Sequence, residues 1–396
     1  MITLKGITWQ NPRGYNPLAH SAAAWQALHP DVRVIWEQRP WYEFEEVILA
    51  SLAKGDNRYD LIMFDHPWVG KLASERWLVP WDSLLTQAEV ESVRARVVAP
   101  STESYELAGH LWALPLDAAC HSSLYRSDLV SADDLPDTWE MLPAWAAARQ
   151  RERGSAGLVL SLEGVLGNCL FLTMMAGLGY PALHDEDHPQ FDAAAAEYCL
   201  SLIQKLLPYV PPGSTHWGPW DIYDHMCADD ECAYSPSIFA YVNYFRGVSP
   251  RGDFLRLATV PQWQRSGQRA AILGGVGLGI AHTCPHLQAA ACYGAYLMSD
   301  ASQFEHFAMH EGQPAANAVW QNAEINERFH HFYRDLQPNM GVAYVRPRYP
   351  AFHAIELANG RALQRFWDGH QTLQETLIHL SKIAETESVR YTSKGT

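Results

Sequence analysis

Positive charge is scarce in this 396-residue sequence. Its 29 Lys and Arg residues stand against 44 Asp and Glu residues, which gives a formal net charge of −15, and no basic cluster stands out. Contacts with the phosphates of DNA or RNA, and with an anionic membrane surface, depend on clustered Lys and Arg. We therefore expect no nucleic-acid partner and no electrostatic attachment to a membrane.

Long apolar runs are also missing. The most apolar segment, Val165–Gly179, is too short to span a bilayer and contains Asn168, so we predict a buried helix there. The first nine residues have neither the basic nor the apolar region of a signal peptide, and their pattern predicts a strand. Two explanations stay open: the protein works in the cytoplasm, or an initiator Met has replaced a removed leader.

Metal-binding cysteine patterns are absent. The seven cysteines are scattered, with neither a CxxC pair nor a set of four zinc ligands, and most sit in apolar runs as small buried side chains. Cys227 and Cys232 are the one close pair, and a loop disulfide between them stays open. The segment 184–188 is rich in His, Asp and Glu, but it lies between prolines and is predicted to be a solvated loop. We expect no metal and no cofactor.

Recognisable catalytic motifs are missing as well. The sequence has no G-x-S-x-G elbow for a nucleophilic serine. The glycine run 274–279 is followed by a strand-like pattern, whereas a dinucleotide site needs a helix that opens on the last glycine. We interpret this run as a strand whose glycines allow a close backbone approach.

The pattern that is present indicates an α/β protein. Hydrophobic residues make up 48% and charged residues 18%, which is typical of a well-buried globular chain. Strand and helix patterns alternate in the first third, which predicts a parallel sheet with right-handed crossovers over residues 1 to about 115. The expected strands are 2–8, 32–37 and 60–64, and the expected helices are 17–28 and 41–52. A mostly helical region follows, with helices expected at 166–178, 193–207, 287–298 and 372–383.

Polar and aromatic residues follow several of the expected strands. Asp65 and His66 come after 60–64, the segment 9–15 follows the first strand, and Asp117 follows the strand at 111–116. The carboxyl ends of parallel strands meet at one edge of a sheet, where open α/β sheets bind ligands. The sequence has 15 Trp and 18 Tyr, whose faces stack on sugars and aromatic rings. Ligand binding, turn structure and acid–base catalysis all stay open for Asp65 and His66, and core packing stays open for each Trp.

A series of short motifs, in order along nearly the whole chain, resembles one known family. The motifs are Tyr59-Asp60-Leu61-Ile62, Leu78-Val79-Pro80-Trp81, Leu111-Trp112-Ala113-Leu114-Pro115, Leu135-Pro136-Asp137-Thr138-Trp139-Glu140, Cys232-Ala233-Tyr234-Ser235-Pro236, Leu273-Gly274-Gly275, Gly312-Gln313-Pro314-Ala315 and Arg346-Pro347. The sequence resembles the periplasmic solute-binding proteins of ABC sugar importers, of the maltose- and glycerophosphate-binding type.

This resemblance implies a two-lobed α/β fold, the type II periplasmic-binding-protein fold, whose discontinuous lobes are joined by a hinge. If the lobes of the family are placed on this sequence, the first lobe comprises residues 1–116 with 270–314, and the second comprises 117–269 with 315–396. The hinge crossovers would lie near Leu116, Arg269 and Ala315. The resemblance also implies a periplasmic or extracellular location, a membrane permease of an ABC transporter as partner, and a monomer that closes on its ligand.

The expected ligand is a small polar organic solute, with a carbohydrate or polyol as the best match. Trp9 with Trp217 or Trp220 would stack on it, and Asp65, His66 and Asp117 would accept its hydroxyl protons. Backbone N–H groups near Gly275 and Arg346 would hold an anionic or carbonyl oxygen. The remaining candidate ligand-binding residues are Asn11, Arg13, Tyr15, His121 and Ser235.

A different class of function stays open beside this one. A cytoplasmic enzyme on the same scaffold would use Asp65 or Asp117 as a base and a histidine as an acid. The absence of a leader favours this reading, whereas the absence of a catalytic motif disfavours it. The sequence leaves the identity and charge of the ligand undetermined.

Overall fold

The computed structural model describes residues 1–183, 189–246 and 251–392. Within these ranges, no helix has both the length and the apolar character needed to cross a membrane. The chain folds into two compact units, each built from discontinuous segments. The first unit comprises Met1–Ala119, Tyr241–Asn243 and Gly274–Tyr333. The second comprises the described parts of Cys120–Ala240, Tyr244–Leu273 and Arg334–Thr396.

The first unit is a sheet covered by helices. Its strands are β1 (Ile2–Trp9), β2 (Val32–Arg39), β3 (Leu61–Asp65), β4 (Leu78–Val79), β7 (Leu114–Pro115) and β12 (Val276–Ala281), with a separate hairpin of β5 (Glu106–Leu107) and β6 (His110–Leu111). Its helices are α1 (Pro12–Leu28), α2 (Trp41–Lys54), α3 (Val69–Ser74), α4 (Gln87–Arg96), α9 (Leu287–Leu297), α10 (Asp300–Ser302), α11 (Asn317–Trp320) and α12 (Ala323–Arg328), with a π-helical turn at Gln303–Phe307.

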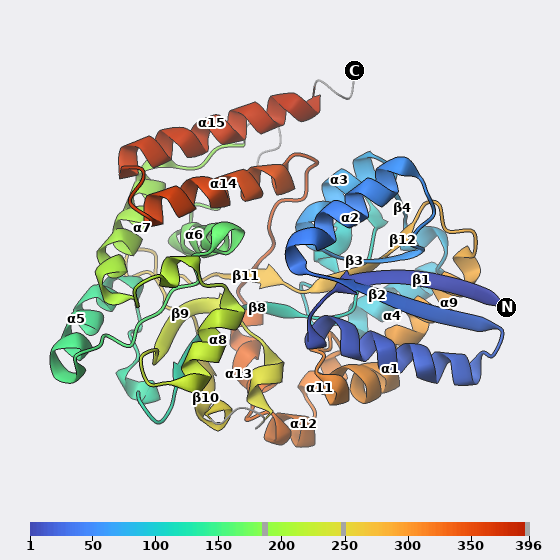
Figure 1. Cartoon of the computed structure of the whole chain (residues 1–396), viewed down its shortest axis with the longest axis horizontal. Coiled ribbons are helices and arrows are strands. Elements are labelled where there is room, and N and C mark those ends of the chain that lie inside the picture. The colour runs from blue at the N-terminus through green and yellow to red at the C-terminus, as the bar shows by residue number, and fades with distance from the viewer. Residues whose placement is uncertain (184–188, 247–250, 393–396) are drawn as a thin grey trace. The chain divides into compact units, whose positions relative to one another are not determined.

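The order of strands in this sheet is β2-β1-β3-β12-β4, with β7 also paired to β12. β1 runs parallel to β2 and β3, as the alternating pattern predicted. The chain steps from β1 to β2 in one direction and from β2 past β1 to β3 in the other, so right-handed crossovers put α1 and α2 on opposite faces (Figure 1). The sheet is mixed rather than wholly parallel, because β12 joins from a distant segment and runs antiparallel to β3.

The first helix begins earlier than the sequence pattern indicated. The sequence pattern predicted a helix at 17–28, but α1 begins at Pro12 and its cap is Asn11, whose side chain accepts a hydrogen bond from the backbone N–H of Arg13. The sequence has two Asn-Pro pairs that fit a helix start, Asn11-Pro12 and Asn16-Pro17. The helix begins at the first pair because β1 ends directly before it. Pro17 is therefore inside the helix, where its missing N–H costs one hydrogen bond.

The second unit has its own sheet, with strand order β10-β8-β11-β13 and β9 also paired to β8. These strands are β8 (Ala119–Arg126), β9 (Tyr234–Phe239), β10 (Leu255–Ala258), β11 (Ala271–Gly274) and β13 (Ala343–Tyr344). The helices are α5 (Leu142–Arg153), α6 (Gly164–Leu178), α7 (Ala193–Leu206), α8 (Pro219–Ala228), α14 (Phe352–Trp367) and α15 (Leu373–Thr392), while α13 (Phe332–Met340) begins in the first unit and ends in the second.

Two helices far apart in the sequence form the core of the second unit. α6 was predicted as a buried apolar helix, and nearly its whole surface is buried, against α7 and α14 (Figure 1). A Cβ at Gly360 of α14 would lie 2.6 Å from the backbone of Gly164 and Val165, so glycine permits the two backbones to approach. The packing of α6 on α14 therefore depends on a residue type that disfavours helices in isolation.

The lobe boundaries expected from the resemblance remain a prediction, and the compact units differ from them at four places. Tyr241–Asn243 belong to the first unit rather than the second, and residues 270–273 belong to the second rather than the first. Asp117–Ala119 belong to the first unit, where Asp117 binds Arg13. Ala315–Tyr333 also belong to the first unit rather than the second. The backbone N–H groups of Ala315 and Ala316 donate to the buried side chain of Gln303, which holds this segment there.

A glycine substitution tests how closely two segments of the first unit approach. Gly275 has a φ of +107°, and a Cβ added there would lie 2.6 Å from the carbonyl oxygen of Asp117. Gly109 also has a positive φ, of +80°, but nothing lies within 4 Å of its added Cβ. We expect Gly109→Ala to cost about 1 kcal/mol of backbone strain, and Gly275→Ala to cost about 2 kcal/mol more because the backbone must also move. Urea unfolding of both variants measures this, and equal losses would show that the close approach to Asp117 does not matter.

Candidate ligand-binding site

One edge of the first unit's sheet gathers residues that are far apart in the sequence. Trp9, Arg39 and Asp65 end the parallel strands β1, β2 and β3, and Trp9 pairs with Arg39. β12 runs antiparallel, so its first residue, Val276, pairs with Asp65 at the same edge. Polar and aromatic side chains thus share the edge at which open α/β sheets bind ligands.

A buried ion pair lies near this edge. Arg13 donates from Nε to Oδ2 of Asp117 at 2.6 Å and from Nη2 to Oδ1 at 3.0 Å, and both side chains are almost fully buried. The guanidinium carbon also lies 4.7 Å from the centre of the Tyr241 ring. Burial, the largest single influence, lowers the pKa of Arg13, but the charge and hydrogen bonds of Asp117, together with the nearby hydroxyls of Tyr241 and Tyr333, raise it by more and hold that pKa above its usual range. The arginine is therefore a fixed cation.

Asp117 is also fixed by the backbone of β12. Its N–H donates to the carbonyl oxygen of Val276 at 3.3 Å, and the N–H of Val276 donates to Oδ1 at 3.1 Å. Because Arg13 and Val276 between them use both carboxylate oxygens, the first role of Asp117 is to position these segments. Its predicted role as an acceptor of ligand hydroxyls is untested, and Arg13 and Gly275 likewise act here as parts of the framework.

The amide of Gln313 joins two further segments of the first unit. Its Nε2 donates to the carbonyl oxygen of Ala118 at 2.9 Å, and its Oε1 accepts from the N–H of Val242 at 3.1 Å. Ala118 and Val242 lie directly beside points where the chain leaves this unit. Gln313 was not among the predicted ligand-binding residues, although it belongs to the motif Gly312-Gln313-Pro314-Ala315 on which the resemblance rests.

Trp9 and the residues after it form the turn into α1. Asn11 caps the helix and orients the backbone of Arg13, while the Trp9 ring packs so closely on Gly14 that a Cβ there would lie 2.8 Å from it. Trp9 is only 5% exposed, and Tyr15 is half-buried on the first turn of the helix. The flat face predicted for stacking at Trp9 is thus largely covered.

Asp65 keeps an accessible carboxylate. Its side chain is 22% exposed, and Oδ1 accepts from the backbone N–H of His66 at 2.8 Å and lies 3.1 Å from its Nδ1. His66 itself is fully buried and meets the Tyr105 ring edge-on, with centroids 6.3 Å apart. The Tyr105 hydroxyl donates to the carbonyl oxygens of Phe64 and Gly275. Of the predicted pair, Asp65 is therefore the residue that can reach a ligand.

In the second unit, His121 lies inside the sheet rather than at its surface. Its Nδ1 lies 2.8 Å from the Ser237 hydroxyl and 3.1 Å from the Thr173 hydroxyl, and its ring meets Phe239 edge-on. Burial and the charge of Arg346 lower the pKa of His121 to about 3. The ring is therefore neutral and hydrogen-bonded within the core, which makes it a structural residue in this conformation.

Arg346 is likewise engaged within the second unit. Its Nη1 donates to Oε2 of Glu356 at 3.1 Å, and Oε1 of Glu356 lies 2.8 Å from Nδ1 of His353. These three side chains are buried, so the charge on the arginine is matched by a carboxylate inside the unit. The backbone near Arg346, rather than its side chain, was predicted to bind a ligand oxygen, and that prediction stays untested.

The remaining predicted residues are also in the second unit. Trp217 stacks on His225 with centroids 3.9 Å apart, and Trp220 is half-buried in the first turn of α8. Ser235 on β9 is fully buried, and among the described residues its hydroxyl has no hydrogen-bond partner.

The structure thus divides the predicted residues into two groups. One group lies around the edge of the first unit's sheet: Trp9, Asn11, Arg13, Tyr15, Asp65, His66, Asp117 and Gly275. The other belongs to the second unit: His121, Trp217, Trp220, Ser235 and Arg346. Tyr241 was not among the predicted residues; it comes after β9, and the guanidinium of Arg13 lies over its ring.

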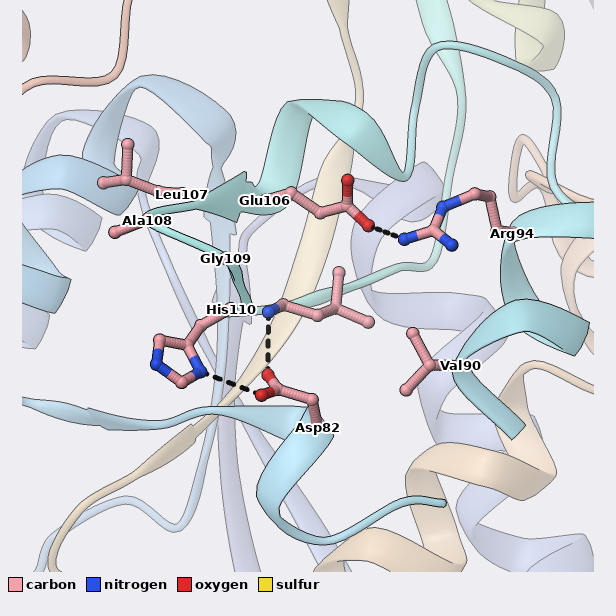
Figure 2. A pocket seen from close by; sticks show the side chains of 9 residues that line it. Asp82, Val90, Arg94, Glu106, Leu107, Ala108, Gly109 and His110 are labelled. Atoms are coloured by element: carbon pink, nitrogen blue, oxygen red, sulfur yellow. Dashed lines mark hydrogen bonds and ion pairs between the residues drawn. The ribbon is translucent and has the colours of Figure 1, made fainter. Parts of the chain in front are cut away.

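A pocket of about 300 Å³ in the first unit contains none of the predicted residues (Figure 2). It lies beside α4 and the β5–β6 hairpin, and its charged groups bind one another. Asp82 accepts from the N–H of Leu111 and contacts His110, while Arg94 pairs with Glu106 (Figure 2). With its charges already paired, this pocket has little to offer a polar ligand.

The structure bears on the predicted absence of a metal site and on the open disulfide between Cys227 and Cys232. The described residues include no group of three or more His, Cys, Asp or Glu side chains arranged to hold a metal ion. The acidic, His-containing segment 184–188 lies outside the described residues. Within the part of the chain that the structure covers, Cys227 and Cys232 are buried. Both are free thiols in the structure, with no disulfide between them.

Comparison with known proteins defines the class. The family model of bacterial extracellular solute-binding proteins matches residues 9–304, and the chain belongs to this family. The maltotriose-binding protein of Pyrococcus abyssi (strain GE5 / Orsay) is 28% identical over 140 residues, which are 35% of this chain and 29% of that protein's length.

Two solved structures establish the fold over almost the whole chain. Maltose-bound T. maritima MalE3 has a TM-score of 0.84 at 20% identity and covers 98% of this chain and 100% of its own. The ABC transporter solute-binding protein from Agrobacterium radiobacter K84, in complex with ribitol, has a TM-score of 0.84 at 18% identity and covers 98% of each chain. The predicted two-lobed α/β fold of solute-binding proteins is thereby confirmed.

The ion pair between Arg13 and Asp117 predicts a large loss of stability when one partner is neutralised. Asp117→Asn leaves the Arg13 cation buried without its counter-charge, and we expect the free energy of unfolding to fall by about 3–5 kcal/mol. Asp137→Asn is the matched control, because Asp137 is 74% exposed and its contact with Arg269 is a surface ion pair worth at most about 1 kcal/mol. Similar losses in the two variants, measured by urea unfolding, would contradict the role assigned to the buried pair.

Because His121 is buried and its pKa is lowered, we expect the folded protein to lose stability in acid. An unfolded imidazole has a pKa of about 6.5, so between that value and about 3 the unfolded chain takes up a proton that the folded chain refuses. Stability therefore decreases as the pH falls through this range, by up to about 1.4 kcal/mol per pH unit from this residue. His121→Gln should flatten the loss between pH 6.5 and pH 4.5, whereas His110→Gln, at a half-exposed histidine, should not. Superimposable pH profiles for wild type and His121→Gln would refute this assignment.

Proposed function

We propose that this protein is the receptor of an ABC importer for a carbohydrate or polyol. Membership in the family of extracellular solute-binding proteins carries the proposal. The ligands named for its structural relatives are of this chemistry, namely maltose and ribitol. The edge of the first sheet supplies a matching group, the partly exposed carboxylate of Asp65.

Within this proposal, the residues at the sheet edge have two kinds of role. Asp65 accepts hydrogen bonds from ligand hydroxyls, because its carboxylate is the one that remains accessible. Arg13, Asp117 and Gly275 position the surrounding backbone, because their polar atoms and close contacts are used within the unit. Trp217 and Trp220 of the second unit are proposed to stack on the ligand once the lobes close.

Closure provides the transport signal in this proposal. A ligand that contacts both lobes only in the closed form shifts the equilibrium towards that form by its difference in affinity. The segments held by Gln313, around Ala118 and Val242, are proposed as hinge strands. The closed receptor, a periplasmic or extracellular monomer, would then dock on the permease of its transporter.

We also propose that the protein does not transform its ligand. Family membership supports a receptor. His66 and His121, the candidate acids nearest to the predicted carboxylates in the sequence, are both buried in the structure. A cytoplasmic enzyme would need one of them at the surface of a site.

The test is a thermal-shift screen of the purified protein against sugars, polyols, sugar acids and betaines. A ligand present at 100 times its dissociation constant stabilises the folded state by about 2.7 kcal/mol, which is a clear rise in melting temperature. We expect a hit among the sugars or polyols, recovered unchanged after overnight incubation. A betaine or sugar-acid hit alone would overturn the ligand class, and conversion of the ligand to product would overturn the receptor proposal.

Two variants then locate the site. Asp65→Asn keeps the cap on the backbone of His66 but loses the negative charge, and we expect it to weaken binding at least about tenfold, as for one charge-assisted hydrogen bond. Asp133→Asn, at an exposed carboxylate of the second unit, should bind like wild type. Unchanged affinity in Asp65→Asn, measured by calorimetry, would place the site elsewhere.

A further inference from the structure

A second pocket of the first unit lies beside the short helix α12 and shares no residue with the candidate ligand-binding site. Its volume is about 400 Å³, which is within the range of small-molecule sites. α12 provides one wall, and the consecutive turns Gln303–Phe307 and Ala308–His310 provide the other. All of the lining residues belong to the first unit, so the pocket is complete within it. They are Phe304, Met309, Glu324, Ile325, Glu327 and Arg328.

The apolar part of this pocket is held in place from both sides. Phe304 and Met309 are half-buried, and Ile325 is almost fully buried. The N–H of Ile325 donates to the side chain of Asn322, which caps α12, at 2.9 Å. Directly before Phe304, the buried amide of Gln303 forms hydrogen bonds with four backbone groups. Because both walls are fixed, the pocket exists before a ligand enters it, which lowers the entropy cost of binding.

The charged groups of this pocket, unlike those of the pocket beside α4, do not bind one another. Glu324, Glu327 and Arg328 are exposed and lie three and four positions apart, so they share one face of α12. Within the described ranges, neither glutamate forms a hydrogen bond or an ion pair. The contacts of Arg328 are weak: Nη1 lies 3.8 Å from Sδ of Met309, and the guanidinium carbon lies 6.0 Å from the centre of the Phe329 ring. The guanidinium therefore has strong donors to offer a carboxylate.

We propose that this pocket binds a free α-amino acid with an apolar side chain, such as leucine or phenylalanine, independently of the proposed carbohydrate ligand. The two glutamates accept hydrogen bonds from the ammonium group, and the guanidinium of Arg328 donates to the carboxylate. The apolar wall packs on the side chain of the ligand. A simple cation would leave Arg328 without a counter-charge, and a simple anion would lie against two carboxylates. An apolar amino acid matches the charges of both signs and the apolar wall together.

The test compares leucine with analogues that each lack one recognised group. N-acetyl-leucine lacks the ammonium group, leucinamide lacks the carboxylate, and glycine lacks the apolar side chain. Each ligand is titrated into protein labelled at its methionine methyl groups, and NMR follows the resonance of Met309, which is assigned with Met309→Leu. We expect leucine and phenylalanine to shift this resonance with dissociation constants of roughly 1 mM, and each analogue to bind at least about tenfold more weakly.

Variants of the charged residues assign each part of the ligand to its partner. Arg328→Gln should weaken the binding of leucine at least about tenfold but not that of leucinamide, which has no carboxylate to lose. Glu324→Gln combined with Glu327→Gln should weaken leucine likewise, but not N-acetyl-leucine. The matched controls are Arg361→Gln, at an exposed arginine of the second unit, and Glu305→Gln, at an exposed carboxylate that does not line the pocket. Both controls should bind leucine like the wild type.

The outcomes separate this inference from the proposed function. An unchanged Met309 resonance at roughly 20 mM leucine, far above the expected dissociation constant, would overturn the site. Equal binding of leucine and leucinamide would make the ligand an organic cation and overturn the amino-acid class. Displacement of leucine by the sugar or polyol found in the thermal-shift screen would place leucine at the receptor's own site and overturn a separate pocket. Leucine binding that persists when that sugar or polyol is saturating would support two distinct sites.

Discussion

The first unit depends on a single buried charge pair. Arg13 at the start of α1 and Asp117 after β7 are separated by more than a hundred positions, and their two hydrogen bonds join the first helix to the segment at which the chain first leaves this unit. Two charges in a dry interior are costly unless each is matched, which makes the pair highly specific: any other arrangement of these segments would leave one charge unpaired. Val276 and the space at Gly275 complete the match from the side of β12.

Much of the fold could be predicted from local patterns. The apolar run of β3, the alternation of β1 and β2, and the buried helix α6 all lie where the sequence placed them, within a few residues. α14 could not be found this way, because Asn359 and Gly360 interrupt its pattern; the glycine is required by contact with α6, about two hundred residues earlier. The discontinuous units were likewise accessible only through the family resemblance, since β12 pairs with β3 across a large separation that no local pattern records.

For the candidate site, the sequence identified the right edge of the sheet but not the state of each side chain. Asp65 and Trp9 are both the last residues of their strands, yet one remains accessible and the other is covered by the turn into α1. His121 has the residue type of a proton carrier, but neighbours from α6 and β9 make it a neutral member of the core. Exposure is a property of packing between distant segments, and so it cannot be inferred from residue type and strand position alone.

The connections around Gln313 and Gln303 differ in kind from the ion pair. Their side chains hold the segments at Leu116, Ala118, Val242 and Ala315–Ala316 through amide hydrogen bonds alone. An amide carries no net charge and does not titrate, so dissolved salt does not screen these bonds and acid does not protonate them. The chain beside the crossings is therefore anchored equally well in dilute and in saline surroundings, an advantage for a protein of a family whose members face the outside of the cell.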